Sequence, residues 1–424
     1  MSGLSEQQEE CKRHFLVWWQ SNPKTRKPFF RIDGYAGSGK TYSIKHIVEG
    51  IEGVVQLAPT GKSALVATQK TGRYTRTVHK ALYIPKGSGA PNKERISEIK
   101  ATMDKLEAQL RDWCGITETE IGLHPSMVFW QKKLDAEENV NNPIFKLNDD
   151  TDLKRAKLIY LTEASMIYES MARDLLALNV PILMEGDPGQ LPPVGGDGYF
   201  MRGAPDFFLD EIHRQAEGSP ILKLATMARN GEHIPLGDYG DGCMVVKKIS
   251  AELALQADQI IVGKNETRHK KNYAARLMKG FISSEVINDD VFVPRTGEKL
   301  ICLRNNDDEG VINGSLWKCL KAERYTASKL HMKVMEEGCN YATNVTAHSQ
   351  LFRGLLQKQM PQWMLCQRGV TQFDFGYAIT CHKSQGSQWD FVVVYDESRN
   401  MGSSKQWLYT ALTRAAKRLV IVTQ

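Results

Sequence analysis

One eight-residue segment, 34–41, restricts what this chain can fold into more than any other part of its sequence. It reads Gly-Tyr-Ala-Gly-Ser-Gly-Lys-Thr and matches the phosphate-binding loop G-x-x-x-x-G-K-[ST] at every fixed position. Such a loop works between a strand and a helix, and here the apolar run 29–32 precedes it while a helix-like segment, 42–48, follows it. Its glycines let backbone N–H groups surround phosphate oxygens, and the helix N-terminus adds the positive end of its dipole. The segment therefore predicts a nucleoside triphosphate site.

The motif also assigns roles within the loop. Lys40 is expected to contact the β- and γ-phosphates, and the Thr41 hydroxyl is expected to bind Mg²⁺. A glycine-rich turn with a chance Lys-Thr pair is the alternative, which the strand and the helix on either side disfavour. The other loop residues expected to contact the nucleotide are Gly34, Gly37, Ser38 and Gly39.

Composition narrows the class of protein. A chain of 424 residues with 42% hydrophobic and 25% charged residues is typical of a globular protein of about two to three domains. No apolar stretch reaches the ~20 residues that a membrane span needs, so we expect no membrane partner. The eight cysteines are scattered without a C-x-x-C pair, which favours free thiols in a reducing cytosol over disulfides or a zinc site. The net charge of +6 is compatible with nucleic acid without being diagnostic.

Apolar runs recur along the chain with helical or loop segments between them. This alternation predicts an α/β fold in which parallel sheets are covered by helices on both faces. Because the runs form two sets, we expect two α/β units in series. The first set is 29–32, 54–57, 158–161 and 182–184. The second set is 259–262, 299–303, 391–395 and 419–422.

Two insertions interrupt this alternation. In the first, 85–152, apolar residues spaced by three and four predict one face of a long helix, with a second strip as its partner in a helical hairpin. The hairpin is expected to pack on itself, and a protrusion that touches nucleic acid or a partner protein is the alternative. The second insertion, 318–371, has no clear period and is expected to be a small β-rich subdomain. The helical stripe consists of Ile96, Ile99, Met103, Leu106, Leu110 and Trp113, and the partner strip of Met127, Trp130 and Leu134.

The run 158–161 leads into the acidic position of a phosphate-loop ATPase. An Asp–Glu pair normally ends this strand, with the Asp orienting Mg²⁺ and the Glu polarising the attacking water. Here Glu163 is present, but Thr162 occupies the Asp position. We therefore expect either weakened ATP hydrolysis or an Mg²⁺ ion that depends on Thr41 and Glu163, and a higher ATPase rate in Thr162→Asp would support this hypothesis. A water shell that makes Thr162 adequate, or a deliberate substitution, is the alternative.

A second polar turn follows the run 182–184. The segment 186–193 reads Gly-Asp-Pro-Gly-Gln-Leu-Pro-Pro. Gln190 can accept a hydrogen bond from an attacking water and donate one to a phosphate oxygen, which suits a γ-phosphate sensor. A simple proline-rich turn is the alternative, and the position of this segment after the acidic motif favours the sensor.

Several further segments follow in a fixed order along the chain. They are 4–8 (LSEQQ), 57–64 (LAPTGKSA), 77–79 (TVH), 209–215 (LDEIHRQ), 376–386 (GYAITCHKSQG) and 408–415 (LYTALTRA). Together with the phosphate loop, their order resembles superfamily 1 helicases, in particular the RecD-like group. The resemblance covers nearly the whole chain apart from the two insertions, and 376–386 is its most specific match. Thr162 is the one clear departure from the family pattern.

The resemblance implies roles for residues that no spacing rule assigns. Gln8 is implied to read the adenine of ATP, and Arg214 and Arg414 are implied to reach the γ-phosphate from the second α/β unit. Gln385 and Gly386 are implied to contact the nucleotide, so that ATP and Mg²⁺ would lie between the two units. The residues implied to contact single-stranded DNA are Pro59, Thr60, Lys62, Thr77, His79, Thr380, His382 and Lys383.

The resemblance also implies how the chain is divided. Two tandem RecA-like domains would each carry one insertion, and the second insertion would be SH3-like or another small β fold. The expected boundaries are 1–84 and 153–205 for the first domain, 85–152 for its helical insertion, 206–317 and 372–424 for the second domain, and 318–371 for its insertion.

The function implied by the resemblance is ATP-dependent DNA unwinding. Such a protein would move 5′→3′ on single-stranded DNA, act on forked duplex DNA, and work as a monomer in a bacterial or phage-infected cytosol, in replication or repair. Two alternatives stay open: an RNA helicase of the same superfamily, and a nucleotide-gated clamp with little turnover, which Thr162 would explain. Tryptophans that could stack on bases or belong to the core are Trp113, Trp130, Trp363 and Trp389.

Overall fold

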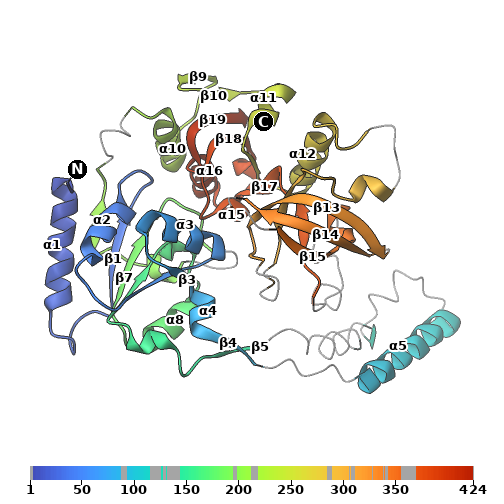
Figure 1. The fold of residues 1–424 in the computed structure, drawn as a ribbon, viewed down its shortest axis with the longest axis horizontal. Helices are drawn as coiled ribbons and strands as arrows, with labels where there is room; N and C mark the ends of the chain where they lie inside the picture. The colour runs from blue at the N-terminus through green and yellow to red at the C-terminus, as the bar shows by residue number, and fades with distance from the viewer. Residues whose placement is uncertain are drawn as a thin grey trace.

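The computed structural model shows two α/β units side by side, with a small β-sheet and a long helix attached (Figure 1). Arg214, Leu134 and Trp363 lie outside the described residues, as does the side chain of Trp113. No helix in the described part is both long enough and apolar enough to cross a membrane. The described residues are 3–86, 93–114, 126–127, 130, 144–193, 198–211, 218–283, 289–304, 306, 311–326, 328–337, 339, 342–354 and 369–423.

The first unit is built on a six-stranded sheet in which every neighbouring pair is parallel. Its strand order is β3-β2-β6-β7-β1-β8, so the strand that enters the phosphate loop lies between β7 and β8. β8 extends this sheet beyond the predicted domain boundary at 205, because its residues pair with the end of β1. The strands are β1 (Phe29–Gly34), β2 (Val54–Ala58), β3 (Thr75–Thr77), β6 (Leu158–Leu161), β7 (Ile182–Gly186) and β8 (Phe207–Leu209).

Helices cover both faces of the first sheet. Side chains alternate along β6, so Leu158 and Tyr160 pack with residues of α1 and α2, whereas Ile159 and Leu161 pack with residues of α4 and α8. A strand buried on both faces needs an apolar residue at each position, which explains the continuous apolar run in the sequence. The helices are α1 (Glu6–Gln20), α2 (Lys40–Val48), α3 (Gly61–Thr71), α4 (Val78–Leu82) and α8 (Glu169–Ala177).

The second unit repeats this arrangement. Its strand order is β17-β11-β18-β19-β10-β9, and all neighbours are parallel except β10 and β9. Two units in series, each with a mainly parallel sheet, confirm the predicted fold class. The strands are β9 (Gly237–Gly240), β10 (Cys243–Val246), β11 (Gln259–Val262), β17 (Ala378–Thr380), β18 (Trp389–Asp396) and β19 (Ala415–Thr423). The helices are α10 (Pro220–Asn230), α11 (Ala251–Gln256), α12 (Asn265–Met278), α15 (Cys381–Ser384) and α16 (Ser404–Leu412).

The run 299–303 does not join the second parallel sheet, and that prediction was wrong. It forms β12, which pairs antiparallel with β13 and β16 in a separate five-stranded sheet. Leu300 and Cys302 pack in the core of that sheet, whereas Ile301 and Leu303 pack with Ile379 of the second unit. Because β12 is buried on both faces, its sequence looks like that of a parallel-sheet strand. The elements are β12 (Lys299–Cys302), β13 (Leu316–Thr326), β14 (Lys329–Glu336), β15 (Ala342–His348), α13 (Ser349–Phe352) and β16 (Phe373–Phe375).

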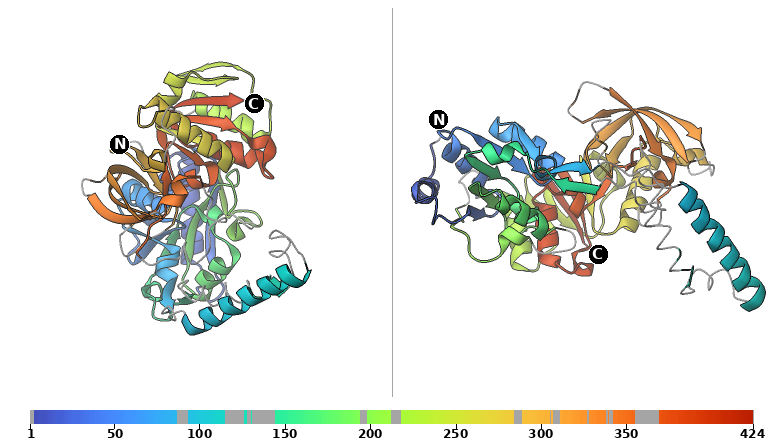
Figure 2. Two further views of the ribbon diagram at one scale, coloured as in Figure 1. Left: turned by 90° about the vertical axis from the view of Figure 1, so that its right-hand side faces the viewer. Right: turned by 90° about the horizontal axis from the view of Figure 1, so that it is seen from below.

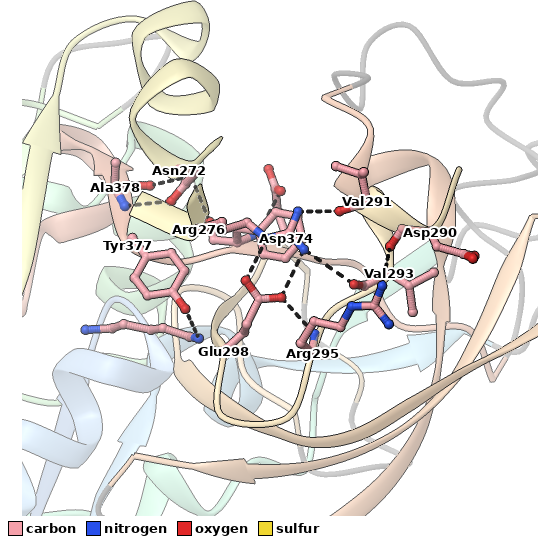
Figure 3. A network of polar contacts seen from close by, with 12 residues as sticks. Asn272, Arg276, Asp290, Val291, Val293, Arg295, Glu298, Asp374, Tyr377 and Ala378 are labelled. Carbon is pink, nitrogen blue, oxygen red and sulfur yellow. Dashed lines mark hydrogen bonds and ion pairs between the residues drawn. The ribbon is translucent and has the colours of Figure 1, made fainter. Parts of the chain in front are cut away.

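A buried polar network attaches the small sheet to the second unit (Figure 3). Arg276 of α12 donates to Glu298, just before β12, at 2.6 Å, and both side chains are almost fully buried. Asn272, one turn earlier, accepts from the Ala378 N–H at 2.8 Å and donates to the Phe375 carbonyl at 3.0 Å. Buried charges are tolerated only when they are paired in this way, so these contacts fix where β12 and β16 lie on the second unit.

The first insertion leaves the first unit through a two-stranded antiparallel ribbon of β4 and β5. The predicted apolar stripe lies on α5, where Leu110 packs with Met127, Met103 and Leu106. This contact is the part of the predicted hairpin that falls within the described residues. Figures 1 and 2 show α5 projecting away from both α/β units. The elements are β4 (Tyr83–Lys86), α5 (Lys93–Cys114) and β5 (Ile144–Leu147).

Candidate active site

The phosphate loop makes a tight turn between β1 and α2. Gly37 and Gly39 have φ values of 85° and 76°, in the left-handed region that favours glycine. Gly34 leaves no room for a side chain, because a Cβ there would lie 2.5 Å from Ser38 Oγ and 2.7 Å from the Leu209 carbonyl oxygen. α2 begins directly afterwards, so its unpaired N-terminal N–H groups open onto the loop. The predicted strand–loop–helix context is therefore confirmed.

The first two residues of α2 already have polar partners. The Lys40 ammonium donates to the carbonyl oxygens of Gly34 at 2.6 Å and Tyr35 at 2.9 Å, which holds it within the loop. The Thr41 hydroxyl donates to Glu185 Oε2 at 3.1 Å. An ammonium and a hydroxyl are thus placed at the start of the helix, where phosphate and Mg²⁺ are bound in this class of loop.

Glu163 follows β6 at the carboxyl end of the first sheet. Its φ of 52° is uncommon for a residue other than glycine and costs about 1–3 kcal/mol, a strain that tends to occur at functional sites. Burial raises the pKa of the Glu163 carboxyl group, and the charges of Arg414 and Lys40 oppose that rise. This environment suits a general base, whose pKa must lie closer to neutrality than that of an exposed carboxylate.

Glu185, on β7, was missed by the sequence analysis. Leu161 pairs with Met184 across two parallel strands, so the residues that follow them, Thr162 and Glu185, are neighbours. Glu185 Oε1 accepts hydrogen bonds from Thr162 Oγ1 at 2.7 Å and from the Tyr160 hydroxyl at 2.6 Å. The available signal was an acidic residue within a buried strand whose other side chains are apolar. A carboxylate is therefore present beside Thr41, supplied by the neighbouring strand.

Gln190 and Asp187 lie in the loop after β7. Gln190 is buried, and within the described residues its Oε1 has no hydrogen-bond partner. Its Nε2 lies 3.5 Å from Asp187 Oδ2. A buried amide oxygen without a partner is rare, because leaving it unpaired costs free energy. Its position is consistent with the predicted contact to a water or to a group on the nucleotide.

Arg414 comes from the second unit, between α16 and β19. Its buried guanidinium donates to the carbonyl oxygens of Thr410 at 3.0 Å and Ser387 at 3.2 Å, and to Thr413 Oγ1 at 3.0 Å. These bonds hold the planar guanidinium in one orientation. A planar guanidinium fork is the group that recognises phosphate oxygens most strongly.

A cavity of about 470 Å³ lies between the two units and collects these groups. The first unit contributes the phosphate loop, Thr162 and Glu163 to its lining. The second unit contributes Arg414 and the turn at Gly386. Glu185 also lines it. The predicted site residues among its lining are Gly37, Gly39, Lys40, Thr41, Thr162, Glu163, Gln190, Gly386 and Arg414.

The groups around this cavity fit a nucleoside triphosphate with Mg²⁺. Gln190 Oε1 and Ser387 Oγ are buried polar atoms that have no partner within the described residues. In that part of the chain no three His, Cys, Asp or Glu side chains converge on a metal position. Mg²⁺ at nucleotide sites does not need such a cluster, because one or two protein oxygens and the phosphates hold it. The Thr41 hydroxyl and the Glu185 carboxylate supply oxygens of this kind.

Comparison with families of known proteins agrees with this site. A family described as an AAA domain matches residues 4–245, and the UvrD-like helicase C-terminal domain matches residues 375–422. The chain belongs to the RecD-like superfamily 1 helicases.

Curated relatives of this RecD-like chain are longer proteins. The ATP-dependent RecD2 DNA helicase of Deinococcus radiodurans is 25% identical over 283 residues, which cover 62% of this chain and 35% of that protein. An uncharacterised protein of Methanocaldococcus jannaschii is 23% identical over 478 residues, which cover 93% of this chain and 36% of that protein. The chain therefore spans about a third of the length of the curated relatives it matches.

Solved structures of Pif1 helicases share the fold of this RecD-like chain. The Bacteroides Pif1 helicase in complex with ADP-AlF3 and ssDNA has a TM-score of 0.53 and 17% identity, covering 99% of this chain and 92% of that one. Bacteroides Pif1 bound to ssDNA has a TM-score of 0.52 and 18% identity, covering 100% of this chain and 92% of that one. At this level of identity the likeness concerns the fold alone.

Hydrogen bonds join the two units of the RecD-like chain behind the phosphate loop. The Tyr409 hydroxyl accepts from the Ala36 N–H at 2.7 Å and donates to Asp187 Oδ2 at 2.8 Å. Thr410 Oγ1 accepts from the Leu191 N–H at 2.9 Å. We call this contact surface the seam; its members are Ala36, Gly61, Lys62, Asp187 and Leu191 on one side and Ile312, Gln385, Trp389, Tyr409 and Thr410 on the other.

Two glutamines predicted to contact the nucleotide have other hydrogen-bond partners. Gln385 Nε2 donates to the Leu191 carbonyl at 2.9 Å, so this side chain joins the two units. Gln8 Oε1 accepts from the Ser5 N–H at 3.0 Å and closes the capping box at the start of α1. Neither residue is among those that line the cavity. Their roles toward ATP in RecD-like proteins stay predictions for this chain.

The threonines predicted to contact DNA in the first unit lie at helix starts. Thr60, next to Pro59, caps α3 by accepting from the Ser63 N–H at 3.1 Å. Thr77 caps α4 by accepting from the Lys80 N–H at 3.2 Å. Each cap explains why a hydroxyl stands at its position without invoking DNA, so contact of these threonines with nucleic acid stays a prediction.

The start of α3 packs against the seam. The Lys62 ammonium lies 4.7 Å from the centre of the Trp389 ring, a cation–π contact between the two units. Burial lowers the pKa of Lys62 to about 8. Gly61 is so close to Ile312 that a Cβ would lie 2.2 Å from its Cγ2 atom, so only glycine fits there without displacement.

One of the residues predicted to contact DNA in the second unit lies close to Ile312 of the seam. Lys383 donates to Asn313 at 2.6 Å, beside Ile312, and burial lowers the pKa of Lys383. Thr380 precedes α15, and burial lowers the pKa of His382 within it. The remaining candidate, His79, has its ring 5.0 Å from the Tyr83 ring. The structure thus brings lysines of both units to one region, whereas His79 lies on α4.

Proposed function

We propose that this chain is an ATP-dependent DNA helicase that moves 5′→3′ on single-stranded DNA and unwinds forked duplexes. The observation that carries the proposal is the cavity shared by the two units, which is lined by Lys40 and Glu163 of the first unit and by Arg414 of the second. An ATPase whose site is divided in this way changes the contact between its domains whenever the nucleotide changes. That coupling is what a motor on a strand requires.

The side chains around the cavity divide the work of hydrolysis. Lys40 holds phosphate oxygens, and Thr41 contributes its hydroxyl to Mg²⁺, which neutralises phosphate charge when bound. Glu163 takes the proton of the attacking water, and Gln190 orients that water. Arg414, held by three hydrogen bonds, stabilises the charge that develops in the transition state. Arg214 would act beside it according to the family pattern.

We propose DNA as the nucleic acid on which this chain acts, because DNA appears in the descriptions of the relative and the solved structures compared above. RecD2 is named as a DNA helicase, and the Pif1 structures contain ssDNA. Lys62 in the seam and Lys383, bonded to Asn313 beside it, supply charge for the phosphate backbone. Contacts of this kind do not read base sequence, as suits a motor that passes over any sequence. The direction of movement, action as a monomer, and a place in replication or repair follow from the family resemblance.

A nucleotide-gated clamp with little turnover is the second candidate, and Thr162 is the residue that favoured it. The position of Glu185 weakens that alternative, because a carboxylate does lie beside Thr41. The site therefore has a carboxylate beside Thr41 as well as Glu163, although β7 supplies it instead of the Thr162 position after β6.

The experiment that tests the proposal uses forked duplexes with a single 5′ or 3′ tail, made of DNA or of RNA. We expect ATP-dependent unwinding of the 5′-tailed DNA fork and ATPase activity stimulated by single-stranded DNA. Lys40→Ala is the matched control and should abolish both activities. Activity on the 3′ tail alone would reverse the direction, and activity on RNA alone would favour the RNA helicase. DNA affinity that responds to ATP without turnover or unwinding would establish the clamp.

A further inference from the structure

Two neighbouring strands carry a hydroxyl and a carboxylate side by side in this site. The position directly after β6, where the Mg²⁺-orienting Asp is expected, holds Thr162, and the adjacent position on β7 holds Glu185. Neighbouring strands lie about 4.8 Å apart, and glutamate is one methylene longer than aspartate. A glutamate on β7 can therefore place its carboxylate close to the space that an aspartate on β6 would fill.

The surroundings of Glu185 resemble those of a metal-orienting carboxylate more than those of a core residue. Its side chain is buried, with 3% of its surface exposed, and within the described residues no Lys, Arg or His forms an ion pair with it. Three hydroxyl groups converge on it instead, from Tyr160, Thr162 and Thr41. A buried carboxylate that has hydroxyl donors but no ion-pair partner is an energetically incomplete arrangement. A divalent cation would complete it.

The contact with Thr41 connects Glu185 to the metal position. A hydroxyl has one proton to donate and two lone pairs, so the Thr41 oxygen can bind Mg²⁺ through a lone pair while its O–H still donates to the Glu185 carboxylate. The Thr162 hydroxyl donates to the other carboxylate oxygen, Oε1, and so fixes the orientation of the carboxylate. Thr162 is then a positioning residue and not a defective metal-binding residue.

We propose that Glu185 is the carboxylate that orients the hydrated Mg²⁺ beside Thr41, in place of the one absent at Thr162. The inference deepens the proposed function, since it assumes that the ligand of the cavity is a Mg²⁺–nucleoside triphosphate. It also changes the meaning of Thr162, because the site keeps the usual number of acidic groups.

The test measures nucleotide binding and does not depend on hydrolysis. A fluorescent ADP or ATP analogue is titrated in EDTA and at increasing Mg²⁺, and bound Mn²⁺ is counted by electron paramagnetic resonance in the presence of ADP. For Glu185→Gln we expect the Mg²⁺ or Mn²⁺ concentration at half-saturation to rise about 10- to 100-fold, with affinity in EDTA unchanged. Glu397→Gln is the matched control, because it neutralises a buried carboxylate that also accepts from a threonine hydroxyl, Thr267 at 2.6 Å, but does not line the cavity, and its metal dependence should stay within about threefold of the wild type.

The double variant Thr162→Asp/Glu185→Gln keeps one carboxylate in the pair and serves if Glu185→Gln alone does not fold. We expect it to recover metal affinity to within a few-fold of the wild type. Wild-type metal dependence in Glu185→Gln, or a folded double variant without metal dependence, would overturn the inference. The failure of this inference and the failure of the proposed function give different results. If the wild type binds Mg²⁺–ATP through Glu185 but does not unwind DNA, only the helicase proposal is refuted. If the wild type unwinds DNA and Glu185→Gln has unaltered metal dependence, only this inference is refuted.

Discussion

The substitution Thr162→Asp tests the packing of the two acidic positions most directly. In the wild type, Thr162 Oγ1 lies 2.7 Å from Glu185 Oε1, and both residues are buried. An aspartate at this position places a second carboxylate at about that distance. Two unit charges so close repel by about 6 kcal/mol at an effective dielectric constant of 20. The protein avoids this cost by keeping the introduced aspartate protonated, so that it donates to Glu185 as the threonine does.

Protonation has its own cost, and that cost depends on pH. Holding an aspartate with an ordinary pKa of about 3.9 in its neutral form costs about 4 kcal/mol at pH 7 and about 1.5 kcal/mol at pH 5. The pKa of the introduced group is raised in the folded state, so its destabilising effect is absent below about pH 4 and grows as the pH rises. The sequence alone suggested the opposite result, a gain of activity in the same variant.

The assay is thermal or urea denaturation of the nucleotide-free protein in EDTA, at pH 5 and pH 7. Thr162→Asn is the matched control, because its amide has nearly the same shape, carries no charge and can donate to Glu185. At pH 7 we expect the first melting transition of Thr162→Asp to lie roughly 8–16 °C below that of Thr162→Asn, with a much smaller gap at pH 5. Equal stability of the two variants at pH 7, or a higher ATPase rate in Thr162→Asp alone, would refute the placement of Glu185 beside Thr162.

Three further changes test other parts of the site. Glu163→Gln should lower DNA-stimulated phosphate release at least about 100-fold while analogue binding stays near the wild-type value; a rate within tenfold would remove Glu163 as the base. Because burial raises the pKa of Glu163, kcat/KM of the wild type should fall on the acid side with a midpoint above the ordinary Glu value of about 4.3, and a flat profile down to that pH would contradict this. Arg414→Lys keeps the charge but loses the planar fork, so kcat should fall about 1,000-fold in steady-state assays with little change in nucleotide affinity. Tyr409→Phe removes the two hydrogen bonds that the Tyr409 hydroxyl forms across the seam and leaves the Ala36 N–H without its acceptor. The cost of about 1–3 kcal/mol should appear in denaturant unfolding, and unchanged stability would mean that this contact is absent in solution.

The phosphate loop and the strands beside it were predictable because their signals are local. The loop sequence requires a strand before it and a helix after it, and β1 and α2 occupy those places. The run 158–161 became β6 with the predicted bounds, since a strand buried on both faces carries an apolar residue at each position. In these cases the residues that decide the structure lie within a few positions of one another.

Glu185 could not be found in the same way. Its importance depends on β6 and β7 being neighbours and on the pairing of Leu161 with Met184, which together place Thr162 beside it. Neither the strand order nor the register is written in a local pattern of residues. The sequence showed a missing acid at one position and an unexplained acid 23 residues later, but only the sheet joins the two into one group.

The same argument explains the error at β12. Its apolar residues alternate between the core of the small sheet and a cluster shared with the second unit, so every position is apolar. A run of that kind is typical of a parallel-sheet strand, and nothing within it reveals that its partners are antiparallel. The helix caps at Thr60 and Thr77 show the converse problem, because a local role is enough to account for residues that the family pattern assigns to DNA.

α3 connects the nucleotide cavity to the proposed DNA contacts through a single rigid element. Ser63 lines the cavity, and a Cβ added to Gly386 of the second unit would lie 3.0 Å from the Ser63 Cβ. Two residues earlier in the chain, Gly61 meets Ile312, and between the two Lys62 lies over the Trp389 ring. Because the first turn of α3 is stiff and is capped at Thr60, a shift of the second unit at Ser63 must also move the contacts at Gly61 and Lys62. Under the proposed function, we therefore expect a change at the γ-phosphate position to reach Lys62 within the first turn of α3, without a long chain of intermediate residues.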